Sequence, residues 1–457
     1  MISWSVSKLI ETRGVFAYKA AAMRTSLLAV LLLASSLFAQ DNPTNPSEPV
    51  NVLCGSLFDS ASGKLLPRQW IEIRDGKITA IRNVPGPSDQ LPASSSIDLS
   101  HETCLPGLID THTHVLLQGD ITAEEYDQQL LKESIAYRAI QATQSALRAL
   151  NNGFTTIRDL ETEGAGYADV DLRNAINRGI VPGPRMKVAS RALDVTGAYP
   201  LLGYAPEVQV PHGVQLVDGP DQVRKAVREQ ISHGADWIKV YVDRSYYVRP
   251  DGVLDDIPTF TPEELRAAVD EAHRERHKIA AHAMALQGVH NAVEAGVDSV
   301  EHGNYITDAD LKTMAAKGIY YVPTIYVGEY VAEGRAKAGA PVWLQMIKIH
   351  EDTFRRALKA GVKIAFGTDA GGLDWKIDEA VEFPFMVKYG MTPVQAIQAA
   401  TRNAADLLGM SDQVGSIEVG KFADIVAAPG NPLDDVTALQ KIDFVMKNGT
   451  VYKRPVR

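Results

Sequence analysis

Cysteine is nearly missing from this sequence: Cys54 and Cys104 are the only two among 457 residues. So few thiols exclude a scaffold built on disulfides, and neither cysteine has the neighbours of a thiolate metal site. Two cysteines in unrelated strands are more often free and buried than paired. We therefore expect them to be unpaired, although an exported chain could oxidise them.

Two further absences concern partners. The chain has no block of Lys and Arg residues, and its formal net charge is −10. A phosphate backbone is held by such blocks, so nucleic acid is not an expected partner. The apolar run at residues 27–38 is shorter than the roughly 20 residues that a membrane-spanning helix needs. We therefore expect no stable membrane anchor.

The same apolar run has the surroundings of a secretory signal. It follows the basic Arg24 and precedes Ala39 and Gln40, after one of which cleavage is expected. Met23 is a better start for such a signal than Met1, so residues 1–22 are interpreted as an over-extended N-terminus. We expect residues 1–40 to be removed and the mature protein to be exported, to the periplasm or outside the cell.

Short β-like runs occupy both ends of the mature chain. Asp75-Gly76 and Asn448-Gly449 separate such runs, and these pairs are typical of two-residue hairpin turns. Because both ends of the chain are rich in β-like runs and the central region is not, we infer one small domain assembled from both termini. We predict a β-sandwich made of residues 41–104 and 413–457.

Residues 105–412 repeat a helix that ends at a glycine and a strand that follows at once. Examples are Gly153 before 154–159, Gly234 before 236–242 and Gly361 before 362–369. Glycine just past a helix fits the left-handed cap, and helices alternating with strands favour a parallel sheet. Five strands follow a glycine in this way, and the runs at residues 105–114, 186–190 and 278–283 bring the count to eight. They predict an α/β fold, a (β/α)8 barrel of the TIM type.

Residues of metal-binding types stand at the ends of several of these strands. His112 and His114 are two apart at the end of an apolar run, so both rings leave the same face of a strand. Alone this pattern is weak evidence, because it occurs by chance on many exposed strands. Candidates at the ends of later strands are Lys239, His282, His302 and Asp369. A barrel builds its site at the C-terminal ends of its strands, so we predict that these side chains meet there.

Imidazole nitrogens and carboxylate oxygens suit divalent ions, and Zn²⁺ is the expected one. His112, His114 and Asp369 could hold one ion, while His282 and His302 could hold a second. Five ligands leave both ions short of partners. We therefore expect two ions that share a further ligand.

Lys239 is the candidate for that shared ligand. Its ammonium form binds metals poorly, but a carbamate formed from its amine and carbon dioxide could bridge two ions. The alternative is that Lys239 pairs with Asp369. A water between two ions becomes a hydroxide nucleophile, and Asp369 can carry its proton to the leaving nitrogen. The expected reaction is hydrolysis of an amide or ester carbon.

Taken in order, these residues resemble the amidohydrolase superfamily with a binuclear metal centre. The matching stretches are His112-Thr113-His114, Lys239, His282, His302 and Gly367-Thr368-Asp369, with Pro106-Gly107-Leu108-Ile109-Asp110 before them. The resemblance extends over nearly the whole mature chain. It implies that the histidines of the first strand and the last aspartate share one metal, that the histidines of strands five and six hold the other, and that a carboxylated lysine bridges them.

Within the superfamily the chain is similar to the imidazolonepropionase-like group, which contains secreted Xaa-Pro dipeptidases (prolidases) and carboxypeptidase-like enzymes. The cues are residues 183–185, 235–241 and 297–303. Lys239 favours hydrolysis of dipeptides or N-acyl amino acids over the alternative, a mononuclear deaminase or cyclic-amide hydrolase without the bridging lysine. A non-catalytic binding protein is disfavoured by the complete ligand set. One departure is Thr196-Gly197-Ala198-Tyr199, where relatives tend to have Thr-Gly-Gly-His.

Loops are expected to select this small-molecule substrate, whose terminal carboxylate would pair with a guanidinium. Arg244, five residues past Lys239, is the first candidate, with Arg158 and Arg191 behind it. The alternative for Arg244 is an ordinary surface arginine. Tyr241 lies on the same side of its strand as Lys239 and could donate to the developing oxyanion. A homo-oligomer is compatible with the sequence.

Overall fold

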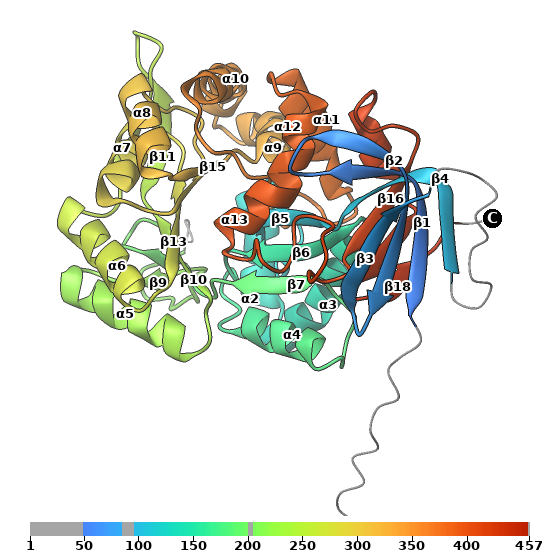
Figure 1. Ribbon diagram of the computed structural model, residues 1–457. Helices are drawn as coiled ribbons and strands as arrows, with labels where there is room; N and C mark the ends of the chain where they lie inside the picture. Colours follow the sequence, from blue (N-terminus) through green and yellow to red (C-terminus); the bar gives the residue numbers. More distant parts are fainter. Residues whose placement is uncertain (1–48, 85–95, 200–203, 456–457) are drawn as a thin grey trace, which may run out of the picture. The chain divides into compact units, whose positions relative to one another are not determined.

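The computed structural model describes residues 49–84, 96–199 and 204–455, and these include every predicted site residue. The predicted signal segment, residues 1–40, lies outside the described residues. The fold is mixed α/β (Figure 1). Within the described ranges, no helix combines the length and the apolar character needed to cross a membrane.

Strands from both ends of the chain pair in one seven-stranded sheet, in the order β18-β17-β16-β4-β1-β2-β3. The strands are β1 (Val50–Asp59), β2 (Lys64–Arg74), β3 (Lys77–Asn83), β4 (Ser96–Pro106), β16 (Ile425–Pro429), β17 (Phe444–Lys447) and β18 (Thr450–Lys453). The two chain ends meet where β4 pairs antiparallel with β16. A sandwich of two facing sheets stays a prediction.

Cys54 and Cys104 form a disulfide, so the prediction of two free thiols is wrong. Cys54 lies on β1 and Cys104 on β4, and their Cα atoms are 5.8 Å apart. β1 and β4 are parallel neighbours, although β2 and β3 lie between them in the sequence. The parallel pairing of β1 with β4 brings the two cysteines together. No local pattern in the sequence predicts this pairing.

The central region contains two parallel sheets. One has the order β5-β6-β7 and the other the order β15-β14-β13-β10-β8-β9. The strands are β5 (Leu108–Thr113), β6 (Phe154–Asp159), β7 (Arg185–Val188), β8 (Leu193–Asp194), β9 (Gln215–Leu216), β10 (Trp237–Tyr241), β13 (Lys278–Ala283), β14 (Ser299–His302) and β15 (Tyr320–Val322). Single parallel bridges, Tyr321 to Ile364 and Thr113 to Ala370, connect one further segment to both sheets.

Helices alternate with these strands as the sequence predicted, and two outer strands form a separate hairpin. The longer helices are α2 (Ala123–Lys132), α3 (Ile135–Asn151), α4 (Ala168–Asn177), α5 (Pro220–Ser232), α6 (Pro262–Arg274), α7 (Leu286–Ala295), α8 (Asp308–Lys317), α9 (Ile325–Lys337) and α10 (Val342–Ala360). Shorter ones are α11 (Glu382–Lys388), α12 (Pro393–Gln398) and α13 (Ala404–Leu407). The hairpin pairs β11 (Asp243–Val248) with β12 (Leu254–Pro258). Gly361 ends α10 with φ of 74°, the left-handed cap that its position predicted.

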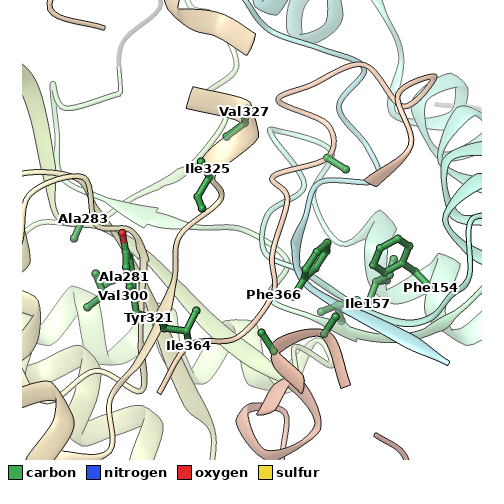
Figure 2. Close-up of a cluster of buried hydrophobic side chains, with 14 of the residues drawn as sticks. Phe154, Ile157, Ala281, Ala283, Val300, Tyr321, Ile325, Val327, Ile364 and Phe366 are labelled. Atoms are coloured by element: carbon green, nitrogen blue, oxygen red, sulfur yellow. The ribbon is translucent and has the colours of Figure 1, made fainter. Parts of the chain in front are cut away.

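Alternation along the parallel strands separates the core from the site. On β10, Ile238 and Val240 belong to the large apolar core, while Lys239 and Tyr241 point to the other face. On β13, Ala281 lies in that core and His282 on the other face. Figure 2 shows part of this core, with Ala281, Val300 and Tyr321 in one group and Phe154 and Phe366 in another. Close packing on one face thus holds the polar side chains of the other face in place.

Candidate metal centre and active site

Three predicted ligands converge at the end of β5. The Nε2 atoms of His112 and His114 are 3.3 Å apart, and Asp369 Oδ1 lies 3.6 Å from the first and 3.1 Å from the second. One donor atom from each residue falls within 4.8 Å of the others. Two imidazole nitrogens and one carboxylate oxygen at such distances suit a single divalent ion.

Backbone hydrogen bonds bring Asp369 to the histidines. The N–H of Asp369 donates to the carbonyl of His112 at 2.8 Å, and the N–H of His114 donates to the carbonyl of Ala370 at 2.6 Å. Asp369 itself has φ of 62°, an unfavourable left-handed conformation for a residue with a side chain. The strand contacts therefore hold the carboxylate in an orientation that a free chain would rarely adopt.

A buried ion pair orients His112. Its Nδ1 lies 2.8 Å from Oε2 of Glu301, whose Oε1 accepts a hydrogen bond from Arg158 Nη2 at 2.9 Å. A carboxylate on Nδ1 fixes the tautomer that leaves Nε2 free for a metal. Burial lowers the pKa of His112 well below its usual value, which keeps the ring in the neutral form that metals bind. Sequence analysis did not identify Glu301 in this role.

Arg158 was predicted as a reserve partner for the substrate carboxylate. The structure places it at 0% exposure, with its guanidinium over the ring of Trp237 at 4.4 Å and its Nε donating to the carbonyl of Thr111 at 2.5 Å. The positive charge of Arg158 is paired with the carboxylate of Glu301. This geometry gives the predicted substrate role no support.

The other predicted ligands continue the cluster. The ring centroid of His302 lies 4.9 Å from that of His112 and 4.6 Å from that of His282. His302 Nδ1 contacts the hydroxyl of Thr324 at 2.8 Å, and His282 Nε2 contacts the hydroxyl of Tyr246 at 2.8 Å. Burial lowers the pKa of both rings, so both are neutral and able to bind a metal. The four histidine rings, which come from β5, the residue directly after it, β13 and β14, thus form one continuous row of ring contacts.

Lys239 is buried beside this cluster. It is 1% exposed, and its Nζ has no hydrogen-bond partner among the residues that the structure describes. The alternative in which Lys239 pairs with Asp369 is therefore not what the structure shows. Burial lowers the pKa of Lys239, which favours the free amine. A buried amine without a hydrogen-bond partner is costly, and such a group is the kind that a bound ligand or a covalent modification satisfies.

A cavity of about 290 Å³ opens onto the cluster, and we call it the inner cavity. Its lining includes His114, His282, His302 and Asp369. Arg244 and Tyr241, two of the predicted substrate residues, also line it, whereas Arg191 lies at a surface contact, 3.8 Å from Glu229. The inner cavity therefore brings together ligand-type residues and one exposed guanidinium.

Several residues of the inner cavity were missed by sequence analysis. Tyr241 donates its hydroxyl to Glu161 at 2.6 Å, and Glu163 and Arg335 lie on the cavity wall. Glu161 and Glu163 follow directly after β6, so acidic residues at a strand end were an available clue. Arg335 lies on α9, far from any strand end in the sequence, and nothing local identifies it.

The fold is mixed α/β, and the ends of its parallel strands bring histidines, an aspartate and a buried amine together around a cavity. These donors suit divalent metals, and the arrangement is that of a metal-dependent enzyme. A model of the Amidohydrolase family matches residues 103–452, and the chain belongs to that family. It is therefore an amidohydrolase-type hydrolase, of a superfamily that generally uses divalent metal ions.

Similar proteins place the chain in the imidazolonepropionase and Xaa-Pro dipeptidase group of the superfamily. Ochratoxinase of Aspergillus niger is 33% identical over 377 residues, which cover 77% of this chain and 76% of that protein. The imidazolonepropionase of Micrococcus luteus is 25% identical over 390 residues, 79% of this chain and 88% of that one. A crystal structure of a Xaa-Pro dipeptidase with methionine bound in its active site is 37% identical, covers 89% of this chain and 100% of its own, and superposes with a TM-score of 0.78.

Proposed function

We propose that this protein is a binuclear metal-dependent amidohydrolase that cleaves the amide bond of dipeptides, as a Xaa-Pro dipeptidase or carboxypeptidase would, or of N-acyl amino acids. The observation that carries the proposal is Lys239, a buried amine beside the four histidines and Asp369 whose nitrogen has no hydrogen-bond partner among the described residues. The names of the similar proteins support it, because they include a Xaa-Pro dipeptidase and an ochratoxinase.

The residues present fit two divalent ions, with Zn²⁺ as the first choice. His112, His114 and Asp369 would hold one ion, and His282 with His302 would hold the other. A carbamate on Lys239 would provide the shared ligand and satisfy the orphaned nitrogen. When bound, the pair of ions would polarise the scissile carbonyl and acidify a water.

The chain's own residues supply orientation and proton transfer. Asp369 Oδ1 would accept the proton of the attacking water and pass it to the leaving nitrogen. Glu301 keeps the ring of His112 in one tautomer throughout. Tyr241 would donate to the substrate oxygen by turning its hydroxyl away from Glu161. Arg244, exposed on the wall of the inner cavity, would bind the terminal carboxylate of the substrate.

The architecture and the cellular location belong to the same proposal. We propose that residues 105–412 close into a (β/α)8 barrel, because the segment 364–370 bridges β15 on one side and β5 on the other. The seven-stranded sheet would be the sandwich domain of both chain ends. Export through the predicted signal is compatible with the Cys54–Cys104 disulfide, since disulfides persist in oxidising compartments.

A substrate panel tests the proposed reaction. Zinc-loaded protein is incubated with N-acyl amino acids, Xaa-Pro and other dipeptides and a cyclic imidazolone, with and without a chelator. We expect hydrolysis of at least one acyclic amide class, loss of that activity on chelation and its return with Zn²⁺. Turnover of the imidazolone alone, with one metal per chain, would instead support the mononuclear cyclic-amide hydrolase.

A further inference from the structure

The hairpin of β11 and β12 reaches the candidate metal centre from outside the parallel sheets. β11 begins two residues after the end of β10, and Asp243, Arg244 and Tyr246 on it all line the inner cavity. Asp243 and Tyr246 have no part in the reaction proposed above. Both lie against His282, the candidate metal ligand on β13. The hairpin therefore contacts the metal centre through two polar side chains whose role is unassigned.

The hydroxyl of Tyr246 engages one ring nitrogen of His282. It lies 2.8 Å from Nε2 of His282 and 2.9 Å from Oδ1 of Asp243. A tyrosine hydroxyl has a single proton to donate, and Tyr246 donates it to Asp243. Its oxygen is then left to accept a hydrogen bond from Nε2 of His282. The neutral ring carries its proton on Nε2 in this arrangement, and Nδ1 is the nitrogen that remains for a metal.

Asp243 is held as the acceptor at the end of this chain of hydrogen bonds. Its Oδ2 accepts the N–H of Met284 at 2.6 Å and the N–H of Ala285 at 3.0 Å, at the start of α7. Burial and the nearby Asp256 raise the pKa of Asp243, whereas these two N–H groups and the hydroxyl of Tyr246 act in the opposite direction. All three groups donate to the carboxylate, and a helix N-terminus favours a negative charge. We therefore take Asp243 as the acceptor.

Two other histidines of the cluster are held by the opposite ring nitrogen. Glu301 lies 2.8 Å from Nδ1 of His112, and the hydroxyl of Thr324 lies 2.8 Å from Nδ1 of His302. Those contacts leave Nε2 of each ring for a metal. The ring of His282 is the one that contacts the hairpin, and it is held by Nε2. The hairpin thus bears on which nitrogen of His282 faces the centre.

We propose that Asp243 and Tyr246 are positioning residues for the second metal ion. Asp243 fixes the hydroxyl of Tyr246 as an acceptor, and Tyr246 fixes the ring of His282 with Nδ1 free. This inference rests on the proposed function, in which His282 and His302 hold that ion, and it adds two residues to the site. The hairpin that carries Arg244, the residue proposed to bind the substrate carboxylate, then also sets the orientation of a metal ligand.

The first test locates the ring proton of His282 without any metal. Long-range ¹H–¹⁵N correlation spectra are recorded on metal-free protein labelled with ¹⁵N in its 11 histidines, and His282→Gln assigns the signal. We expect the proton on Nε2 in the wild type.

Asp243→Asn should reverse this chain of hydrogen bonds. The amide oxygen of the asparagine must still accept the two backbone N–H groups, so its NH2 group faces Tyr246. The hydroxyl of Tyr246 then donates to Nε2 of His282, and the ring proton should move to Nδ1. A ring proton on Nδ1 in the wild type, or no change in Asp243→Asn, would overturn the proposal.

Zinc titration measures the consequence for the second ion. Tyr246→Phe removes the acceptor and Asp243→Asn reverses it, so each should weaken binding of the second zinc roughly 10–100-fold and change the first much less. Tyr247→Phe is the matched control, because Tyr247 is 48% exposed on the same strand and its hydroxyl contacts Asp255 at 3.3 Å. It should leave both affinities unchanged. An unchanged second affinity in both Tyr246→Phe and Asp243→Asn would overturn the proposal.

The two measurements distinguish this inference from the proposed function. The expected proton shift in Asp243→Asn, together with a single zinc per wild-type chain, would support the orienting contacts and contradict the binuclear function. Two zinc ions per wild-type chain, with the ring proton and the second affinity unaffected in both variants, would overturn the positioning role alone.

Discussion

The inner cavity and a second cavity of about 430 Å³ beside it, which we call the outer cavity, are built from different parts of the fold. Four of the six predicted ligands lie on parallel strands, and His114 and Asp369 are tied to those strands by backbone hydrogen bonds. The outer cavity is lined by the start of α2, the segment around Tyr199 and the connection from α9 to α10. Strand ends are held by ladders of hydrogen bonds, whereas loops and helix ends are free to vary. We infer that the proposed chemistry resides at the parallel strands, whereas Arg244, the residue proposed to bind the substrate carboxylate, lies outside them on β11.

Removing Lys239 should damage the inner site most. Without the shared ligand, Lys239→Ala should lower kcat/KM on the order of 10³-fold, because stabilisation of the developing charge is lost. Steady-state assays of the zinc-loaded protein measure this effect, and added acetate should restore part of it by replacing the carbamate. Lys363→Ala, at an exposed ion pair with Asp406, is the matched control and should stay active. Undiminished activity of Lys239→Ala would remove the basis of the proposed mechanism.

Glu301 should affect both metal binding and folding. Glu301→Ala leaves the buried charge of Arg158 unpaired, which should cost about 3–5 kcal/mol of unfolding free energy. It also frees the ring of His112, so zinc affinity should fall roughly 10–100-fold. Urea unfolding and metal titration measure the two effects. Glu301→Gln retains hydrogen bonding and should be affected less; equal losses in the two variants would contradict the orienting role.

Replacing Arg244 tests whether this residue recognises the terminal carboxylate of the substrate. If its guanidinium binds the terminal carboxylate, Arg244→Ala should raise KM roughly 10–100-fold with little change in kcat, the value of one charge-assisted hydrogen bond. The effect should vanish for a substrate whose carboxylate is amidated. Arg249→Ala, near the end of the same hairpin and paired with Asp251, is the control. An equal KM increase for the amidated substrate would show that Arg244 does not recognise the carboxylate.

Replacing Glu379, which lines neither cavity, should have a smaller effect on the free energy of unfolding. It is fully buried, Asn152 donates to its Oε2 at 2.7 Å, and burial raises its pKa from 4.5 to about 8. As pH rises, the unfolded chain releases this proton before the folded protein does, so the free energy of unfolding falls between about pH 4.5 and 8.

Glu379→Gln removes the titrating carboxyl, so this proton no longer contributes to the pH dependence of unfolding. Relative to wild type, the variant should gain about 1–3 kcal/mol at pH 8.5 and almost nothing at pH 5. Urea unfolding at the two pH values measures the difference. A gain that is the same at both would show that the carboxyl does not titrate as its burial requires.

The sequence predicts which side chains lie together where local pattern and backbone geometry coincide. His112, His114, Lys239, His282 and His302 are recognisable because each follows an apolar run, and strand alternation then sets its direction. It failed for Cys54 and Cys104, which are joined by a parallel pairing that skips two strands.

Tertiary packing decided the remaining cases. Arg158 and Arg244 look alike in sequence, yet one is buried against Glu301 and the other lines the inner cavity. Arg335 and Trp343 line both cavities from helices α9 and α10, whose placement depends on packing and not on a motif. Residues proposed to select the substrate are therefore the part of the site that the sequence predicts least.

The proposed mechanism depends on a carbamate on Lys239 that joins two metal ions. It is tested directly by measuring zinc per chain together with the ¹³C spectrum of protein assembled in ¹³C-labelled bicarbonate. We predict two zinc ions per chain and one carbamate carbon signal, with the signal absent from Lys239→Ala. One zinc per chain and no carbamate signal in the active wild-type enzyme would show that Lys239 is not a ligand shared by two ions.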